Sequence, residues 1–134
     1  MPCNMLAVQS ASIEINEKVL AALFGDALAR NALTALINQQ TGIALTAYAY
    51  GDGRTLNLYG GGIDITIRLD GSITVRGVSS AETQRYTAVL KDALAAVAIV
   101  IVQNMVKTAL VSAGVPVVAD AYNAAGARVM TLRV

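Results

Sequence analysis

Acidic side chains are the residues of this chain that could do acid–base chemistry, because it contains nine Asp and Glu residues, no histidine and one cysteine. Two carboxylates that folding brings together can serve as a general acid and a general base. The candidates beside predicted helices and strands are Glu14, Glu17, Asp26, Glu82, Asp92 and Asp120. Their spacing selects no pair. A small carboxylate-dependent enzyme is therefore our second alternative, and we predict no catalytic residue and no enzyme activity.

Metal and cofactor sites are not predicted either. A Cys/His zinc site cannot be built from Cys3 alone, and no histidine is present to activate its thiol. Asp52, Asp64 and Asp70 could be imagined as a Mg²⁺ or Ca²⁺ cluster. However, Asp52 and Asp70 fall in predicted turns, where Asp commonly makes local hydrogen bonds. We expect no bound metal and no cofactor.

Three tyrosines and one arginine gather around the first predicted hairpin: Tyr48, Tyr50, Tyr59 and Arg54. Aromatic rings beside a guanidinium can stack on a base or a sugar, or anchor a protein partner. Cross-strand packing on a half-exposed sheet face is the structural alternative. Our first alternative function is an adaptor that binds a protein or peptide, and this group is its predicted partner-binding site.

The charge balance argues against electrostatic capture of nucleic acid. Ten Lys and Arg against nine Asp and Glu leave a net charge of +1, and no basic stripe appears. Residues 1–5 lack the basic and apolar regions of a signal peptide. The longest apolar run, 93–102, is shorter than the roughly 20 residues that a bilayer span requires. We expect a cytoplasmic protein without a membrane span.

The first predicted helix lies between Asn16, a favourable N-cap residue, and Gly42, a stop signal. Its apolar side chains occupy one side as far as Leu28 and roughly the opposite side from Leu33 onward. Either the helix breaks near residues 30–31, or both of its faces are covered.

Alternating apolar and polar residues predict a strand over 5–15 and four antiparallel strands over 43–77. The four strands form a meander with one apolar and one polar face. The polar face carries Thr46, Tyr48, Asn57, Asp64, Thr66, Arg68, Thr74 and Arg76. A sheet of this kind needs helices over its apolar face.

Turn lengths in the meander follow from matching its apolar faces. Two-residue turns at 51–52 and 60–61 are predicted, and a third at 70–71 is not, because it would set Arg68 opposite Ile73. A three-residue loop over 70–72 restores the match. The predicted pairs are Ala47 with Leu56, Leu45 with Leu58, Leu58 with Ile63, Leu56 with Ile65, Leu69 with Ile73 and Ile67 with Val75.

A second helical region follows the meander. Ser79 and Glu82 have the spacing of a capping box, and Gly114 ends the segment. Its stretch 95–102 is apolar on all sides, which predicts burial on every side, within one domain or against another copy. A β-branched run leaves open whether one helix or two form, with 103–104 as the candidate break.

The chain ends in a predicted hairpin with a four-residue loop at 123–126. Its pairs are Ala119 with Met130, Val117 with Leu132 and Val115 with Val134. No repeat or linker interrupts the sequence, so we predict one domain, 1–134. The predicted fold is α+β: a four-stranded antiparallel meander packed against two helical regions, with a C-terminal β-hairpin.

The second half of the chain carries a resemblance. Its features are the segment Ile63–Ser72, the helical segment, Gly114 and the terminal hairpin. In this order of elements, more than in any diagnostic motif, the chain resembles a small conserved family of cyanobacteria and plastids. That family is functionally uncharacterised, so the resemblance implies no site residues.

Low charge and apolar helix faces favour self-association as the function. Only 14% of the residues are charged and 55% are hydrophobic, and a small domain has limited means to hide that much apolar surface. We predict a non-enzymatic structural or scaffold protein that forms a homo-oligomer or filament. The predicted self-association residues are Val97, Ile99, Val102 and Val106. A helix face and a sheet edge are both available for assembly.

Overall fold

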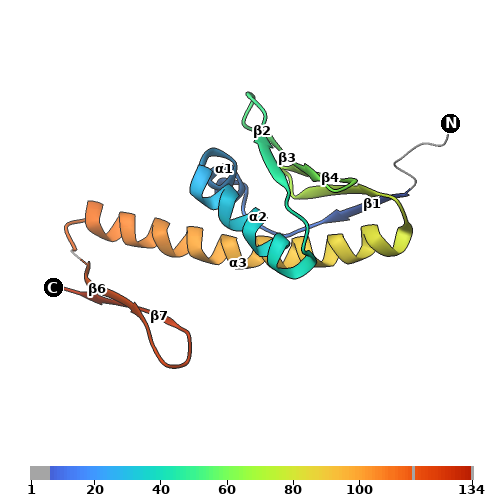
Figure 1. Ribbon diagram of the computed structural model, residues 1–134. Helices are drawn as coiled ribbons and strands as arrows, with labels where there is room; N and C mark the ends of the chain where they lie inside the picture. Colours follow the sequence, from blue (N-terminus) through green and yellow to red (C-terminus); the bar gives the residue numbers. More distant parts are fainter. Residues whose placement is uncertain (1–6, 116, 134) are drawn as a thin grey trace. The chain divides into compact units, whose positions relative to one another are not determined.

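The computed structural model contains a five-stranded antiparallel sheet, three helices and a separate two-stranded hairpin (Figure 1). It describes residues 7–115 and 117–133. The predicted α+β class is confirmed. Contacts divide the chain into two compact units, Met1–Ile101 and Val102–Val134. The single domain over 1–134 stays a prediction.

The sheet belongs to the first unit and has one strand more than the predicted meander. Its strands are β1 (Ala7–Ser12), β2 (Thr46–Ala49), β3 (Thr55–Gly60), β4 (Ile63–Arg68) and β5 (Ser72–Gly77). Their order is β1-β5-β4-β3-β2. The N-terminal strand pairs along its whole length with β5, because its alternation matches the free side of that strand. Strands β1 and β2 are therefore the two edges.

Two of the predicted turns keep the correct faces but are displaced. Ala47 pairs with Leu58, not Leu56, because the amide of Tyr50 bonds the carbonyl of Thr55 at 3.0 Å, which leaves the four-residue loop 51–54. The next turn consists of residues 61–62 rather than 60–61. Leu58 therefore pairs with Ile65 and Leu56 with Ile67. Leu45 lies just before β2 and has no strand partner there.

The three-residue connection after β4 is confirmed in length and displaced by one position. The amide of Gly71 bonds the carbonyl of Arg68 at 3.0 Å, so the loop consists of residues 69–71. Ile67 pairs with Ile73, and the predicted pairs of Ile67 with Val75 and Leu69 with Ile73 are wrong. A displacement of the loop by one residue moves each pairing by two, so it leaves every side chain on its predicted face.

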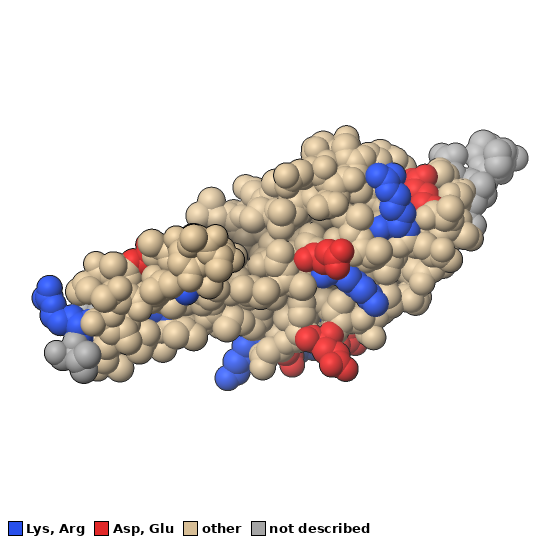
Figure 2. Space-filling model, turned by 90° about the horizontal axis from the view of Figure 1, so that it is seen from below, with Lys and Arg blue, Asp and Glu red and all other residues tan. Residues whose placement is uncertain are grey.

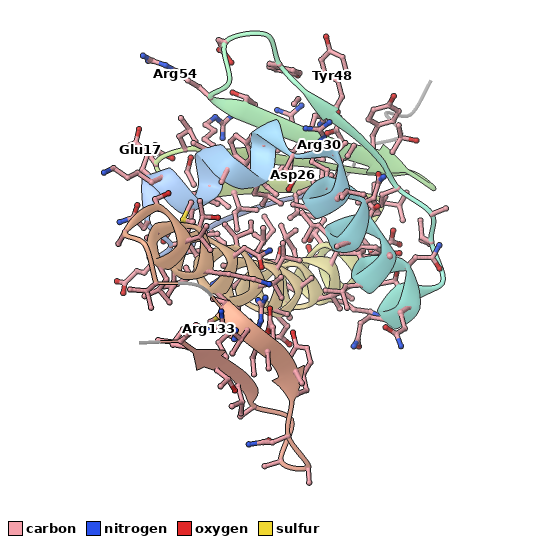
Figure 3. The ribbon with its side chains drawn as sticks, turned by 90° about the vertical axis from the view of Figure 1, so that its left-hand side faces the viewer. Glu17, Asp26, Arg30, Tyr48, Arg54 and Arg133 are labelled. Carbon is pink, nitrogen blue, oxygen red and sulfur yellow. The ribbon has the colours of Figure 1, made fainter. Side chains whose placement is uncertain are left out.

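The first predicted helix breaks, but earlier than expected. Helix α1 (Glu17–Gly25) ends and α2 (Ala27–Thr41) begins at Asp26, and the two helices are bent by 95°. Asp26 has an extended backbone, and its carboxylate accepts a hydrogen bond from the amide of Leu28 at 2.9 Å. Arg30 donates to the carbonyl of Phe24 across the corner (Figure 3). An N-cap carboxylate thus decides the position of the break.

This corner explains why the apolar side chains change sides. Leu20, Leu23 and Phe24 of α1 and Leu33 and Ile37 of α2 are all buried in the same core. Leu28, which helical spacing groups with the α1 residues, is 79% exposed because the break turns it away.

Helix α3 (Ser80–Ser112) is a single helix of 33 residues with no break at 103–104. The hydroxyl of Ser79 accepts from the amide of Glu82 at 3.2 Å, as the capping-box spacing predicts. At the other end Gly114 adopts φ +83, and the amide of Val115 bonds the carbonyl of Leu110 at 2.9 Å. Both predicted ends are confirmed.

The core of the first unit lies between one face of the sheet and its helices (Figures 1 and 3). Burial alternates along β3, β4 and β5, so the opposite face of the sheet stays uncovered. The buried sheet residues are Leu56, Leu58, Ile63, Ile65, Ile67, Ile73 and Val75. Helix α3 contributes Tyr86, Leu90, Ala93, Leu94 and Val97.

The second unit contains the hairpin β6 (Val117–Tyr122) and β7 (Arg128–Leu132). Val117 pairs with Leu132 as predicted, but Ala119 pairs with Thr131, not Met130, because the register shifts between Val117 and Ala119. The loop has five residues, 123–127, because Tyr122 pairs with Arg128. The predicted pair of Val115 with Val134 lies outside the described residues, as does Cys3.

Replacing Gly71 with alanine should destabilise the first unit more than replacing Gly53. Both glycines have positive φ, +88 and +68. A Cβ on Gly71 would also collide with the backbone carbonyl of Ile13, whereas a Cβ on Gly53 meets nothing within 4 Å. We expect Gly53→Ala to lower the free energy of unfolding by about 1 kcal/mol and Gly71→Ala by about 2–4 kcal/mol. Urea unfolding measures both, and equal losses would contradict the close approach of β1 to this loop.

Candidate functional site

The three tyrosines of the first hairpin lie on the uncovered face of the sheet. Tyr48, Tyr50 and Tyr59 are 56%, 45% and 46% exposed. The rings of Tyr48 and Tyr50 meet edge to face, with centroids 5.4 Å apart. Tyr59 lies opposite Thr46 on the neighbouring strand, diagonal to Tyr48. The predicted aromatic group is therefore present as an exposed patch beside the β2 edge.

Arg54 does not belong to this patch. It lies in the loop between β2 and β3, and its side chain points away from Tyr48 (Figure 3). It lines an open hollow of about 470 Å³ instead, whose other lining residues are Glu17, Asp52, Thr55, Arg68, Leu69 and Asp70. The structure thus brings together only the three tyrosines of the four predicted partner-binding residues.

Two of the three carboxylates around this hollow have structural partners. Asp52 accepts from the amide of Arg54 at 2.9 Å, and Asp70 accepts from the amide of Ser72 at 2.8 Å. Hydrogen bonds from the side chain and backbone of Ser72 hold the pKa of Asp70 below its ordinary value. A general acid needs a raised pKa, so Asp70 is not suited to that role.

Two further carboxylates, on α2 and on the polar face of the sheet, also have local hydrogen-bond partners. Asp26 caps α2, and Asp64 accepts from the side-chain amide of Asn57 at 2.6 Å. Among the described residues, no group of three or more His, Cys, Asp or Glu side chains could hold a metal ion. The hydrogen bonds of Asp26, Asp52, Asp64 and Asp70 are thus local structural contacts.

Helix α3 is exposed where the sequence predicts burial on every side. Ile99 is 58% exposed, Val100 43% and Val102 44%. The chain's own sheet covers only one side of the helix, so this stretch is not buried on every side, and burial against another copy stays a prediction. Val97, a predicted self-association residue, is only 4% exposed and belongs to the core.

Five exposed apolar residues of α3 form a row, which we call the α3 stripe: Ala95, Ile99, Val102, Val106 and Ala109. Their spacings are four, three, four and three residues, as in the heptad seam of a coiled coil. At about 100° per residue, the stripe points away from the side that carries Tyr86, Leu90 and Val97. Ile99, Val102 and Val106 were predicted, whereas the two alanines were not.

The stripe lies in the part of α3 that carries no charge, because no Asp, Glu, Lys or Arg occurs between Asp92 and Lys107. Charged side chains are also sparse on the face of the molecule in Figure 2. By length and composition alone, α3 could cross a membrane: an 18-residue stretch of it has a mean hydropathy of 2.0 and is 17% buried. The apolar run 93–102 is shorter than the apolar stretch of the helix, because Gln103 and Asn104 interrupt the run but do not end the helix.

Asp120 is the centre of a polar cluster in the second unit. Its carboxylate accepts from Arg128 through two nitrogens, at 2.8 and 2.6 Å, and from Lys107 at 2.8 Å. Arg128 also donates to Asn104 at 3.0 Å. The hydrogen bonds from Arg128 and then from Lys107 hold the pKa of Asp120 well below its ordinary value. The cluster joins the hairpin to the C-terminal half of α3.

This cluster was missed because the predicted hairpin register was wrong. A four-residue loop would pair Asp120 with Val129 and put Arg128 on the other face. In the structure Tyr122 pairs with Arg128 and Asp120 with Met130, so both charges lie on one face. Lys107 and Asn104, three residues apart on α3, were the signal that this side of the helix meets polar groups.

Replacing Asp120 with asparagine should loosen β6–β7, because Arg128 and Lys107 lose their shared anion. A lowered pKa means that Asp120 stabilises the fold above its unfolded pKa of about 3.9. That contribution is lost as the pH falls through the lower folded pKa. The protection factors of the amides in Val117–Tyr122, which compare the observed with the intrinsic exchange rate at each pH, should therefore fall in the wild type below about pH 4, and they should be low in Asp120→Asn even at pH 7. Equal protection in the two proteins at pH 7 would contradict the role of the cluster.

No protein-family model, curated protein or solved structure matches this chain. The resemblance of its second half to the cyanobacterial and plastid family stays a prediction.

Proposed function

We propose that this protein is a non-enzymatic structural protein that associates with copies of itself through the α3 stripe. The observation that carries the proposal is the heptad-spaced row of exposed, uncharged side chains on a helix whose other side is packed in the core as far as Val97. We further propose a cytoplasmic location, without bound metal, cofactor or nucleic acid.

The four–three spacing of the α3 stripe fits best a second copy of this protein as the partner that covers it. A four–three spacing keeps a row of side chains facing one partner helix, because it matches the winding of two helices around each other. The α3 helix of another molecule presents the same row, so the contact is self-complementary. Ala95 and Ala109 are small and allow close approach, while Ile99, Val102 and Val106 supply the larger surface.

The free energy gained by burying the stripe predicts weak association through the stripe alone. Complete burial of an Ile or Val side chain is worth about 1.5–3 kcal/mol, so each half-exposed one gains on the order of 1 kcal/mol. Ile99, Val102 and Val106 from two copies supply about 6 kcal/mol. Lost translational and rotational freedom opposes this with about 4–15 kcal/mol. The stripe should therefore form a concentration-dependent contact, and a stable assembly needs further surface.

Insertion of α3 into a bilayer competes with this proposal for the same apolar surface. A span of about 20 residues starting at Ala93 would remove Leu94 and Val97 from the core. It would also place Lys107 in hydrocarbon, together with Gln103 and Asn104. Both effects oppose insertion. Self-association leaves the core intact, so it is the function that we propose.

The exposed tyrosine patch supports an adaptor as the second candidate function. Tyr48, Tyr50 and Tyr59 present large, stiff rings on an uncovered face, which is the composition of binding hot spots. The double change Tyr48→Ala and Tyr50→Ala should leave the thermal midpoint within a few degrees, because both rings are about half exposed. If binding of a protein partner is the function, its capture should fall at least tenfold, whereas a variant that captures it normally rules out this surface.

The self-association proposal predicts different effects for two neighbouring valines. Val100 and Val102 are 43% and 44% exposed, but about 200° of helical rotation separates them. Val102→Glu should strongly reduce concentration-dependent growth in mass, because it buries a charge in the stripe contact. Val100→Glu should not. Sedimentation velocity over a concentration series compares them. Equal behaviour of the two variants, or flotation of the wild type with lipid vesicles, would contradict the proposal.

A further inference from the structure

Strand β1 leaves one edge of the sheet open. It pairs with β5 on one side, and no other described strand pairs with it. The strand is six residues long, regular in register, and contains neither a charged residue nor a proline. Edge strands that avoid pairing are usually short, charged, bulged or interrupted by proline. Here the opposite edge, β2, has only four residues, so β1 is the better edge for pairing.

The backbone groups that face the open edge can be assigned by alternation. The amide of Ile13 bonds the carbonyl of Gly71 at 2.9 Å, which places the odd-numbered residues of β1 in hydrogen bonds with β5. Bonded and free residues alternate in an antiparallel pair. The amides and carbonyls of Val8, Ser10 and Ser12 therefore face outward.

We propose that β1 pairs antiparallel with β1 of a second copy, which joins two sheets into one of ten strands. A twofold axis at Ser10 sets Ser10 opposite Ser10 of the other copy and Val8 opposite Ser12. Each of these three pairs exchanges two backbone hydrogen bonds, about six in total. Because paired residues have the same parity, the outward face of one sheet continues the outward face of the other. No charged side chain in β1 of one copy lies opposite a charged side chain in β1 of the other.

This inference deepens the self-association proposed above and rests on it. The α3 stripe and the β1 edge are different surfaces, and each would be self-complementary about its own twofold axis. A molecule with two such contacts joins one neighbour through each, which builds an open chain unless the two axes close a ring. The product is a filament in which stripe contacts and β1 contacts alternate.

The test compares four full-length proteins by sedimentation velocity and negative-stain imaging: wild type, Val102→Glu, Ser10→Pro and the double variant. Ser10→Pro removes an outward amide and no bond to β5, and proline is tolerated at such edge positions. We expect long assemblies for the wild type, dimers for each single variant, and monomers for the double variant. Ser10→Ala keeps the amide and should assemble as the wild type does.

The absence of either contact would give a different set of assembly states for the variants. If the β1 contact does not form, Ser10→Pro assembles like the wild type and Val102→Glu is a monomer. If the stripe contact does not form, Val102→Glu assembles like the wild type and Ser10→Pro is a monomer. A monomeric wild type overturns both proposals.

A second variant keeps the test decisive if Ser10→Pro does not fold, which circular dichroism would reveal. The double change Val8→Glu and Ser12→Glu sets like charges opposite each other between copies. Within one molecule these side chains lie on the uncovered face, and Val8 is opposite Arg76, which a glutamate would suit. Dimers formed through the stripe are the expected result. Assemblies as long as those of the wild type would overturn the β1 pairing.

Discussion

A single uncharged segment of α3 sets the conditions for the rest of the structure. Between Asp92 and Lys107 the helix carries no charged side chain, yet one antiparallel sheet can cover only one side of a helix. Leu94 and Val97 use that side. Ile99 and Val102 remain exposed. An apolar surface that a fold cannot cover favours a partner, and the heptad spacing of the α3 stripe is the reason we propose another helix as that partner.

The sheet carries a related constraint in its hydrogen bonds. Five strands in the order β1-β5-β4-β3-β2 leave two edges, and an edge exposes unpaired amides and carbonyls. The uncharged sequence of β1 does nothing to prevent pairing there. The proposed stripe contact is weak by itself, so a second contact with about six backbone hydrogen bonds is what would make an assembly persistent. Helix packing and strand pairing then act on separate surfaces of one small molecule.

The sequence predicted the buried face of each strand more reliably than the positions of the turns between strands. Alternation assigned the buried side of every strand in the meander, because a two-residue shift in pairing preserves it. The loops at 51–54, 61–62 and 69–71 were displaced because more than one turn satisfies the same face match. In the C-terminal hairpin a one-residue error occurred. It separated Asp120 from Arg128, and a register shift beyond Val117 gave no signal in the apolar pattern.

The candidate sites also combine features that the sequence predicts with features that it does not. Exposure of Tyr48, Tyr50 and Tyr59 follows from their position on the polar face, which alternation predicts. The separation of Arg54 from them depends on loop geometry. Val97 lies in the core, whereas Val102 follows the last buried residue of α3 and has a different helical phase. That phase is set by the sheet, which the all-round apolar sequence of this segment does not specify.

Absolute mass in solution tests the central claim most directly. Light scattering after size exclusion would follow the wild-type protein over a concentration series, from well below to well above the micromolar range. Our account predicts a mass that rises above the 13.9 kDa of one chain as the concentration increases, toward species many chains long. A constant mass of one chain at the highest concentration would contradict it.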